Sequence, residues 1–360
     1  MAASPRAGRR VAARVVIESL AAVDETLLRA GGGFVLAFLL ALYGTPVAAR
    51  AAIEFEIVDF PDGSLKQHRG PVPYLGGLAI YVAFLVALGV VFEFDARVLG
   101  ILLAGTIVVL LGLIDDFGVL GVGTKFAGQF VAAWVLVKCD IAIHIAIFPK
   151  PVSFVLSMLW IVGVANAFNI IDIMDGLAAG TALIASVFLL IVSILNGQPA
   201  IAVLTAVLAG SLLGFLRFNY PPARIFMGDC GSLFLGMTLA SLAMIGKYDR
   251  INPIGYLSPL MILGIPLFDT AYVSLLRVLR GASPFRGSPD HFAIRLRRAG
   301  WPVGAVVNAT YAAGIVLGSL ALFNLFLGAG QSLFLVAGVV ATMALVGIAL
   351  AFVPVRGGGT

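Results

Sequence analysis

A long uncharged run that stops at two adjacent carboxylates constrains this chain most. No residue from 99 to 114 carries a charge, and the run ends in Asp115 and Asp116. Such a run is typical of a membrane-spanning helix, because lipid cannot satisfy free backbone groups. A carboxylate at mid-bilayer costs roughly 2.5–3.5 kcal/mol, so acids kept at span ends are often functional. Two adjacent carboxylates repel each other and favour a shared proton or a bound cation, although a solvated helix end explains the pair equally well when it is taken alone.

The composition extends this interpretation to the whole chain. Of its 360 residues, 61% are hydrophobic and 11% are charged, whereas soluble domains carry about 25% charged residues. We expect a basic arm over residues 1–30, one transmembrane catalytic domain over 31–354 and a short tail over 355–360. The apolar runs lie near 34–53, 74–94, 97–114, 124–138, 152–167, 177–195, 199–217, 231–246, 254–276, 303–328 and 331–353. The sequence therefore predicts an all-α polytopic membrane protein with about eleven transmembrane helices, or ten, in contact with membrane lipids and not with nucleic acid.

The charges of the loops predict an orientation. Eleven Lys and Arg residues fall in the loops after odd-numbered runs and five in the loops after even-numbered runs. Because positive loops face the cytoplasm, the odd-numbered loops are predicted to be cytoplasmic. The arginines of the amino-terminal arm disagree with this assignment, since it places them outside. We give the loops more weight, because several of them agree.

The predicted cytoplasmic face is also rich in acidic residues. Of the eighteen acids, eleven lie in or beside its loops: Glu54, Glu56, Asp59, Asp62, Asp115, Asp116, Asp172, Asp175, Asp229, Asp269 and Asp290. Topology signalling requires basic residues but no acids. This mixture indicates a site that binds a polyphosphate through cations and through a metal held by carboxylates.

Single motifs on this face each have an ordinary structural explanation as well. Lys66 and His68 lie among turn residues and suit a phosphate, or they only lead into the next span. Lys125 can neutralise phosphate oxygens near the acid pair, or it is an interfacial anchor. Asp229 stands between glycines, where it is either an N-cap or an exposed carboxylate. Asp269 is expected to pair with a polar or basic neighbour rather than to react.

A polar ladder follows the fifth run. Asn166, Asn169, Asp172 and Asp175 recur every three residues. On a regular helix each step of three falls about 60° short of a full circle, so the four side chains converge only if the helix tightens or breaks. Gly176 permits such a break. A buried structural ladder is the alternative.

Taken together, these motifs resemble the polyprenyl-phosphate N-acetylhexosamine-1-phosphate transferases, over roughly Val58 to Trp301. The matching stretches are residues 68–77, Asp115-Asp116, Asn166 to Asn169 with Asp172 and Asp175-Gly176-Leu177, and Phe226 to Asp229 with Gly231-Ser232. The first stretch resembles the N-acetylglucosamine branch more than the peptidoglycan pentapeptide branch. Two features depart from the family. Ile173 replaces a glycine, and Ala293 and Ile294 replace two histidines of the last loop, which leaves His291.

The resemblance implies a reaction and a set of roles. A lipid phosphate attacks the β-phosphorus of a UDP-sugar, releases UMP and primes a cell-envelope polysaccharide at the cytoplasmic face of the bacterial inner membrane. Mg²⁺, with Mn²⁺ as the alternative, is expected as the cofactor, and a homodimer as a common assembly. Asp115 and Asp116 are the predicted catalytic residues, and Asp229 and Asn169 the predicted metal ligands. The predicted substrate-binding residues are Lys66, His68, Lys125, Asn166, Asp172, Asp175, His291 and Arg295.

Two other functions remain open from the sequence. A transporter or lipid flippase would bind its cargo near the bilayer midplane on broken, repeated helices. The chain shows no convincing internal repeat, and its acids lie at span ends. The other alternative is a family member that has lost catalysis and serves as a scaffold. The replacement of two histidines in the last loop favours it, whereas the presence of the acids argues against it.

Overall fold

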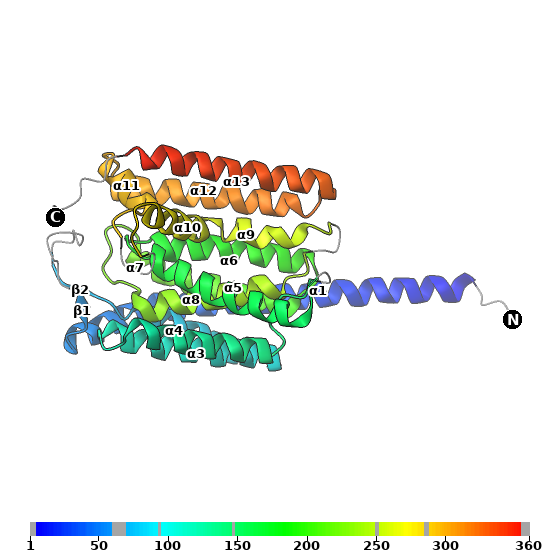
Figure 1. Ribbon diagram of the computed structural model, residues 1–360. Coiled ribbons are helices and arrows are strands. Elements are labelled where there is room, and N and C mark those ends of the chain that lie inside the picture. Colours follow the sequence, from blue (N-terminus) through cyan, green and yellow to red (C-terminus); the bar gives the residue numbers. More distant parts are fainter. Residues whose placement is uncertain are drawn as a thin grey trace.

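The chain forms a bundle of long helices, seen from the side in the computed structural model (Figure 1). The structure describes residues 5–59, 70–92, 95–145, 148–248, 252–283 and 288–353, with only the backbone described for residues 5–24. Lys66 and His68 lie outside the described residues. The helices are α1 (Pro5–Glu54), α2 (Gly76–Val91), α3 (Ala96–Asp116), α4 (Val122–Lys138), α5 (Lys150–Ile171), α6 (Leu177–Leu195), α7 (Pro199–Asn219), α8 (Gly228–Ile245), η1 (Gly255–Leu257), α9 (Ser258–Ile262), α10 (Gly264–Leu279), α11 (Phe292–Arg298), α12 (Val303–Asn324) and α13 (Ala329–Ala351). Two short strands, β1 (Val58–Asp59) and β2 (Val72–Pro73), pair antiparallel, with Val58 opposite Pro73.

The predicted fold class is confirmed, but the predicted number of spans is too high. Within the described residues, eight helices are long and apolar enough to cross a membrane, or nine if α9 and α10, bent by 72°, form one span. The runs near 74–94 and 124–138 do form helices, α2 and α4, of 16 and 17 residues. At 1.5 Å per residue a 16-residue helix is about 24 Å long, short of a hydrocarbon core of about 30 Å. For α2, hydropathy alone does not reveal this shortfall, because flanking turn residues extend the apolar run to 74–94. The run at 124–138 is already short in the sequence.

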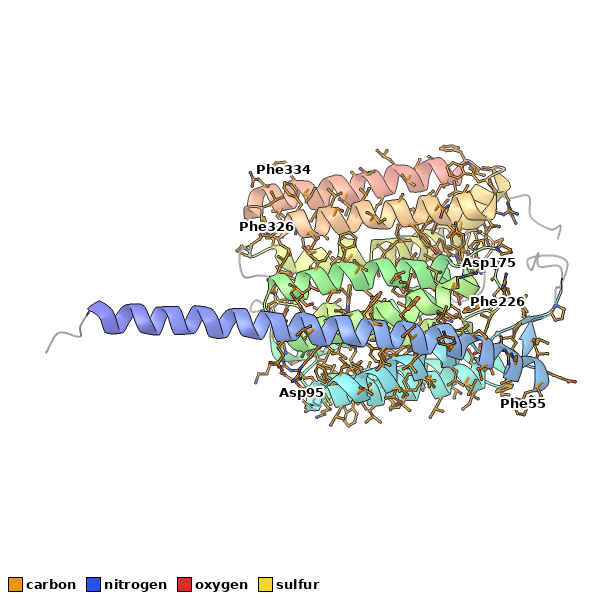
Figure 2. All side chains as sticks on the ribbon, turned by 180° about the vertical axis from the view of Figure 1, so that it is seen from behind. Phe55, Asp95, Asp175, Phe226, Phe326 and Phe334 are labelled. Carbon is orange, nitrogen blue, oxygen red and sulfur yellow. The ribbon has the colours of Figure 1, made fainter. Side chains whose placement is uncertain are left out.

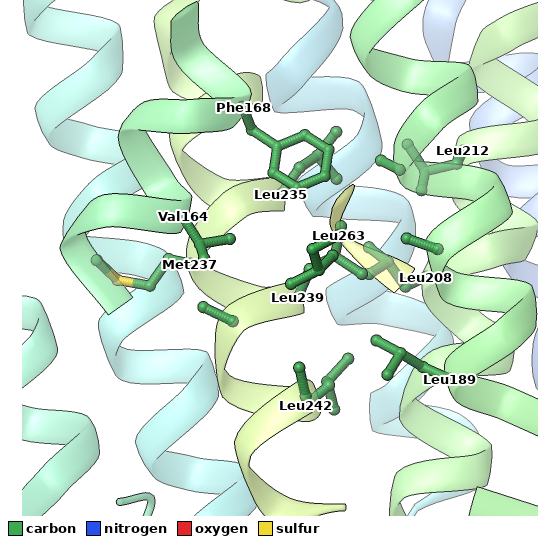
Figure 3. Packing of buried hydrophobic residues seen from close by; sticks show 14 of the residues in the cluster. Val164, Phe168, Leu189, Leu208, Leu212, Leu235, Met237, Leu239, Leu242 and Leu263 are labelled. Atoms are coloured by element: carbon green, nitrogen blue, oxygen red, sulfur yellow. The ribbon is translucent and has the colours of Figure 1, made fainter. Parts of the chain in front are cut away.

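Helix α8 lies at the centre of the bundle. Leu235, Leu239 and Leu242 of α8 face side chains from several neighbouring helices (Figure 3). Those neighbours include Val164 and Phe168 of α5, Leu189 of α6, and Leu208 and Leu212 of α7. Lipid is as apolar as these side chains, so close packing rather than release from water holds the helices together. This central position fixes the start of α8 relative to the ends of its neighbours.

The two ends of the bundle differ. Asp175 and Phe226 lie at one end, whereas Asp95 and Phe326 lie at the other (Figure 2). Helix α3 starts at the second end, where the Asp95 carboxylate accepts the Val98 N–H at 2.8 Å. Its last residue, Asp116, therefore reaches the end that holds Asp175. Helix α1 projects beyond the opposite end, so the basic arm starts on the side that the loop charges predict (Figure 1).

Candidate active site

The ammonium group of Lys125 marks the centre of the candidate site. Its Nζ lies 2.6 Å from Asp115 Oδ2 and 2.5 Å from Asp229 Oδ2. It also donates to Asn169 Oδ1 at 3.3 Å. These four side chains come from α4, α3, α8 and α5, so distant parts of the sequence meet here. The side chains of Lys125 and Asp115 are 17% and 13% exposed and that of Asp229 is 34% exposed, which keeps the group within reach of a ligand.

Asn169 joins α5 to α8 and sets the direction of its own amide oxygen. Its Nδ2 donates to Asp229 Oδ1 at 2.8 Å and to Ser232 Oγ at 3.0 Å. Because the amide nitrogen is directed at α8, the amide oxygen is the atom left for Lys125. One carboxylate oxygen of Asp229 is thereby held by an amide donor, while the other faces the ammonium group.

Asp116 acts on the backbone of α8. Its Oδ1 accepts the Asp229 N–H at 2.7 Å, and its Oδ2 accepts the Cys230 N–H at 3.3 Å. The first N–H groups of a helix have no partner in the helix, and a negative charge there is favourable. Asp116 thus caps α8 from another helix. Asp229 lies in the first turn of α8 but does not cap it, so its carboxylate faces Lys125 and Asn169 instead.

A glycine allows α3 to approach α8 closely enough for this cap. A Cβ at Gly112 would lie 2.4 Å from the Cα of Cys230. Any larger residue would push the helices apart, one turn before the acid pair. The sequence shows this glycine but not the neighbour that requires it.

The predicted break of the polar ladder is present between α5 and α6. Helix α5 ends at Ile171, and Gly176 has φ +73°, a conformation that suits glycine. Asp175 Oδ2 accepts the Ala223 N–H at 2.9 Å, and Asn219 Oδ1 accepts the Gly176 N–H at 3.1 Å. Asp175 therefore ties this turn to the segment that leads into α8.

Tyr311, on α12, holds the same turn from the other side. Its hydroxyl donates to the Gly176 carbonyl at 2.6 Å. Sequence reasoning missed Tyr311, since an aromatic residue within an apolar run gives no signal. Asn219 was missed as well, although its place before Tyr220-Pro221-Pro222 is a turn signal.

Asp172 lies in the turn with no hydrogen bond described for its carboxyl group. Burial, together with the negative charges of Asp229, Asp116 and Asp175, raises the pKa of Asp172 to about 8. At neutral pH this side chain therefore carries a proton most of the time. The neighbouring Ile173, which replaces the family's glycine, is 36% exposed and leaves the turn intact.

Asn166 lies apart from the oxygens around Lys125. Its Nδ2 donates to Gln129 Oε1 at 2.5 Å and to the Val162 carbonyl at 2.7 Å. Gln129, on α4, is fully buried. This pair ties α4 to α5 about one turn below Asn169, and sequence reasoning missed Gln129 because no motif includes it.

His291 belongs to a second polar group, near α10 and α11. Its Nδ1 lies 2.7 Å from Asp269 Oδ2, and the other oxygen of Asp269 accepts the Phe292 N–H at 3.1 Å. The pairing predicted for Asp269 is confirmed. Ala293, at one of the two replaced histidine positions, is fully buried.

Arg295 has a structural task that differs from the predicted one. It is 1% exposed, and it donates to Asp290 Oδ1 at 2.6 Å and to the Leu350 and Val353 carbonyls at 3.1 and 2.9 Å. These carbonyls end α13, where the helix leaves acceptors unpaired. Burial opposes ionisation of Asp290, but hydrogen bonds from Ser288 and Arg280 outweigh it and hold the pKa of Asp290 below its usual value.

The oxygens around Lys125 fit a hard divalent cation. Carboxylate and amide oxygens are the ligands that Mg²⁺ prefers, usually together with water. Here these oxygens converge on the ammonium group of Lys125, at the position that a divalent ion would take. Among the described residues, no group of three His, Cys, Asp or Glu side chains could hold a metal ion. The third oxygen of this set is instead the amide oxygen of Asn169.

Similar proteins point to the same part of the chain. The model of glycosyl transferase family 4 matches residues 98–247, which contain all four side chains of the candidate site. A probable undecaprenyl-phosphate N-acetylglucosaminyl 1-phosphate transferase of Bacillus subtilis is 33% identical over 82% of this chain and 84% of its own. A decaprenyl-phosphate N-acetylglucosaminephosphotransferase of Mycobacterium leprae is 31% identical over 76% and 78%. An undecaprenyl-phosphate alpha-N-acetylglucosaminyl 1-phosphate transferase of Thermotoga maritima is 31% identical over 70% and 76%. The family expected from the motifs is confirmed: this multi-pass membrane protein belongs to glycosyl transferase family 4, among relatives of the polyprenyl-phosphate N-acetylglucosaminyl 1-phosphate transferase type.

Proposed function

We propose that the protein transfers N-acetylglucosamine 1-phosphate, or a related N-acetylhexosamine 1-phosphate, from a UDP-sugar to a polyprenyl phosphate. The products are a polyprenyl diphosphate sugar and UMP, and the reaction primes a cell-envelope polysaccharide. The observation that carries this proposal is the convergence of Asp115, Asp229 and Asn169 oxygens on the Lys125 ammonium at one end of a membrane bundle. The names of the relatives support the sugar and the lipid.

The chemistry requires neutralisation of charge. An oxygen of the lipid phosphate attacks the β-phosphorus of the UDP-sugar, and the bond from that phosphorus to the bridging oxygen breaks, so UMP leaves. Both reactants are anions, and phosphoryl transfer depends on positioning and on electrostatic stabilisation. Asp229 and Asn169, with Asp115 beside them, would hold Mg²⁺ or Mn²⁺. The ion would neutralise charge on the diphosphate.

The protein's own groups have distinct parts in this scheme. Asp115 orients the lipid phosphate or accepts its proton, whereas Asp116 keeps the start of α8 in place. Lys125 neutralises phosphate oxygens. The turn that carries Asp172 and Asp175 lies at the same end and is proposed to bind the nucleotide. His291 is proposed to steady a phosphate oxygen, with its ring held by Asp269.

The site suits a substrate that stays in the membrane. It lies at the end of the bundle, where a lipid with a phosphate head can arrive from the bilayer while a nucleotide sugar arrives from water. The excess of basic residues in the loops of this end favours the cytoplasmic face of a bacterial inner membrane. A transporter would instead place its binding groups near the midplane, so the geometry favours transfer over transport.

An enzymatic assay tests the proposal directly. Purified protein is incubated with Mg²⁺, undecaprenyl phosphate and radiolabelled UDP-N-acetylglucosamine, with other UDP-sugars in parallel. We expect label in a lipid product, release of UMP and loss of both after chelation of the metal. Absence of lipid product with every sugar would contradict the proposal. Lipid movement in proteoliposomes without UMP release would identify a flippase instead.

A further inference from the structure

We propose that Lys125 is a displaceable internal cation. In the metal-free protein it occupies the position of the divalent ion, and the ion drives it from there onto the phosphates of the UDP-sugar. This inference rests on the proposed function. It concerns an exchange between two positions of one side chain.

The hydrogen-bonding capacity of the ammonium group is the first argument. A lysine has three N–H donors. In the structure its Nζ contacts three oxygens, one each from Asp115, Asp229 and Asn169. No donor remains for a substrate phosphate while all three contacts last. Lys125 can therefore neutralise the acids or bind phosphate in full, but not both.

The second argument is the charge of the position itself. The Asp115 and Asp229 carboxylates both approach one atom within 2.6 Å, an arrangement that requires a positive charge between them. A divalent ion would take the same oxygens at about 2.0–2.1 Å. Two cations cannot share that space. Binding of the ion thus requires Lys125 to move.

The third argument is that Lys125 has room and length to move. It lies in the first turn of α4, one helical turn after Gly121, where a Cβ would meet nothing within 4 Å. Its own side chain is 17% exposed. The lysine stem is flexible along four carbons. The displaced ammonium can therefore leave toward the open side of the site, where the substrate diphosphate must enter.

The exchange predicts a link between metal and nucleotide binding. Without nucleotide, the ion must displace an ammonium that gains no new partner. With a UDP-sugar bound, the displaced ammonium finds phosphate oxygens, so the ion binds more tightly. Such a coupling is reciprocal, and the metal must tighten nucleotide binding by the same factor.

Metal titration of full-length variants in detergent tests the proposal. Mn²⁺ binding is followed by electron paramagnetic resonance in wild type, Lys125→Gln and Lys138→Gln. Lys138 lies at the other end of the same helix, over the Trp134 ring, so its variant controls for loss of one positive charge. We expect Lys125→Gln to bind Mn²⁺ about tenfold or more tightly without nucleotide, since charged hydrogen bonds no longer compete. Lys138→Gln should bind like wild type.

Two further measurements separate the outcomes. UDP-N-acetylglucosamine should tighten Mn²⁺ binding in wild type by a larger factor than in Lys125→Gln. Asp229→Asn in the Lys125→Gln background should abolish binding, which locates the ion. Equal or weaker binding by Lys125→Gln overturns the exchange while the proposed function stands. If UDP-N-acetylglucosamine does not change the affinity of wild type for Mn²⁺, the exchange is overturned without any variant. Absence of Mn²⁺ binding in every protein, with or without nucleotide, overturns the exchange together with the metal-dependent function.

Discussion

Two groups of paired charged side chains, one around Lys125 and one around Arg295, look alike in the sequence. In the structure they differ in solvent exposure and in hydrogen-bond partners. Around Lys125, carboxylates from two helices meet an ammonium, and the side chains are 13–34% exposed. Around Arg295, the Asp290 carboxylate meets a guanidinium, and these two side chains are 5% and 1% exposed. The side chains of the first group are partly exposed to solvent. In the second group, the Arg295 guanidinium donates to the Leu350 and Val353 carbonyls at the end of α13. Access and partners, rather than residue type, separate a candidate reactive site from a structural group.

The largest effect should follow a change in the open group. Asp229→Asn removes one negative charge from the proposed metal site while keeping the acceptor for Asn169. We expect sugar-phosphate transfer to fall by about 10³-fold or more, because the charge that counters two anionic substrates is lost. Transfer is measured with labelled UDP-sugar, and insertion and folding are followed by size-exclusion chromatography. Asp140→Asn, in an exposed pair with Arg97, is the control and should retain activity.

Breaking the sealed group should lower stability rather than activity. Arg295→Met leaves the Asp290 carboxylate buried without its main partner, which costs about 3–5 kcal/mol in the free energy of unfolding. Unfolding is followed by circular dichroism in detergent. Arg280→Gln removes the exposed partner of the same carboxylate, and it should cost less than about 1 kcal/mol. A stable Arg295→Met protein with a raised KM for the UDP-sugar would restore the substrate role predicted from the sequence.

Asp269→Asn should have an intermediate effect. Its carboxylate accepts hydrogen bonds from His291 and from the Phe292 N–H. An amide oxygen in its place can still accept the Phe292 N–H, but its NH₂ group then faces His291 Nδ1. One bond is lost unless the imidazole changes tautomer and accepts at Nδ1, and we expect a cost of about 1–3 kcal/mol. The unfolding free energy and the transfer rate are both measured. If transfer falls to the level of His291→Gln while stability is unchanged, the pair serves the reaction rather than the fold.

A further effect, graded with pH, should appear in the stability of the protein. The pKa of Asp172 is raised from 3.8 to about 8, so the folded protein holds this proton more tightly than the unfolded chain. The stabilisation of the folded state by this bound proton is complete below pH 3.8, and it is lost as the pH rises toward 8. Without metal, wild type should therefore lose stability relative to Asp172→Asn across this range and level off above it. The pKa of Asp290 is lowered, so its contribution should be lost as the pH falls instead. An identical pH profile for wild type and Asp172→Asn would show that Asp172 ionises normally.

Much of the candidate site could be predicted, because its polar residues stand out at the ends of apolar runs and match the family's motifs. Asp115, Lys125, Asn169 and Asp229 stand out in this way, and they lie together. Asn166 and Arg295 stand out in the same way, yet they pair with Gln129 and with the carbonyls that end α13. A motif shows that a polar group must find a partner, but it does not show which partner.

The sequence by itself determined the membrane class, the all-helical fold, the glycine that permits a break at position 176 and the polar end of the bundle. These follow from local chemistry: uncharged runs, a residue without a side chain and the cost of charge in lipid. Only the tertiary structure decided that Asp116 caps α8 while Asp115 faces Lys125, and that α2 is shorter than a full span. The reason is geometric, since neighbouring residues at a helix end point in different directions. Each one's task depends on which distant backbone the packing brings beside it.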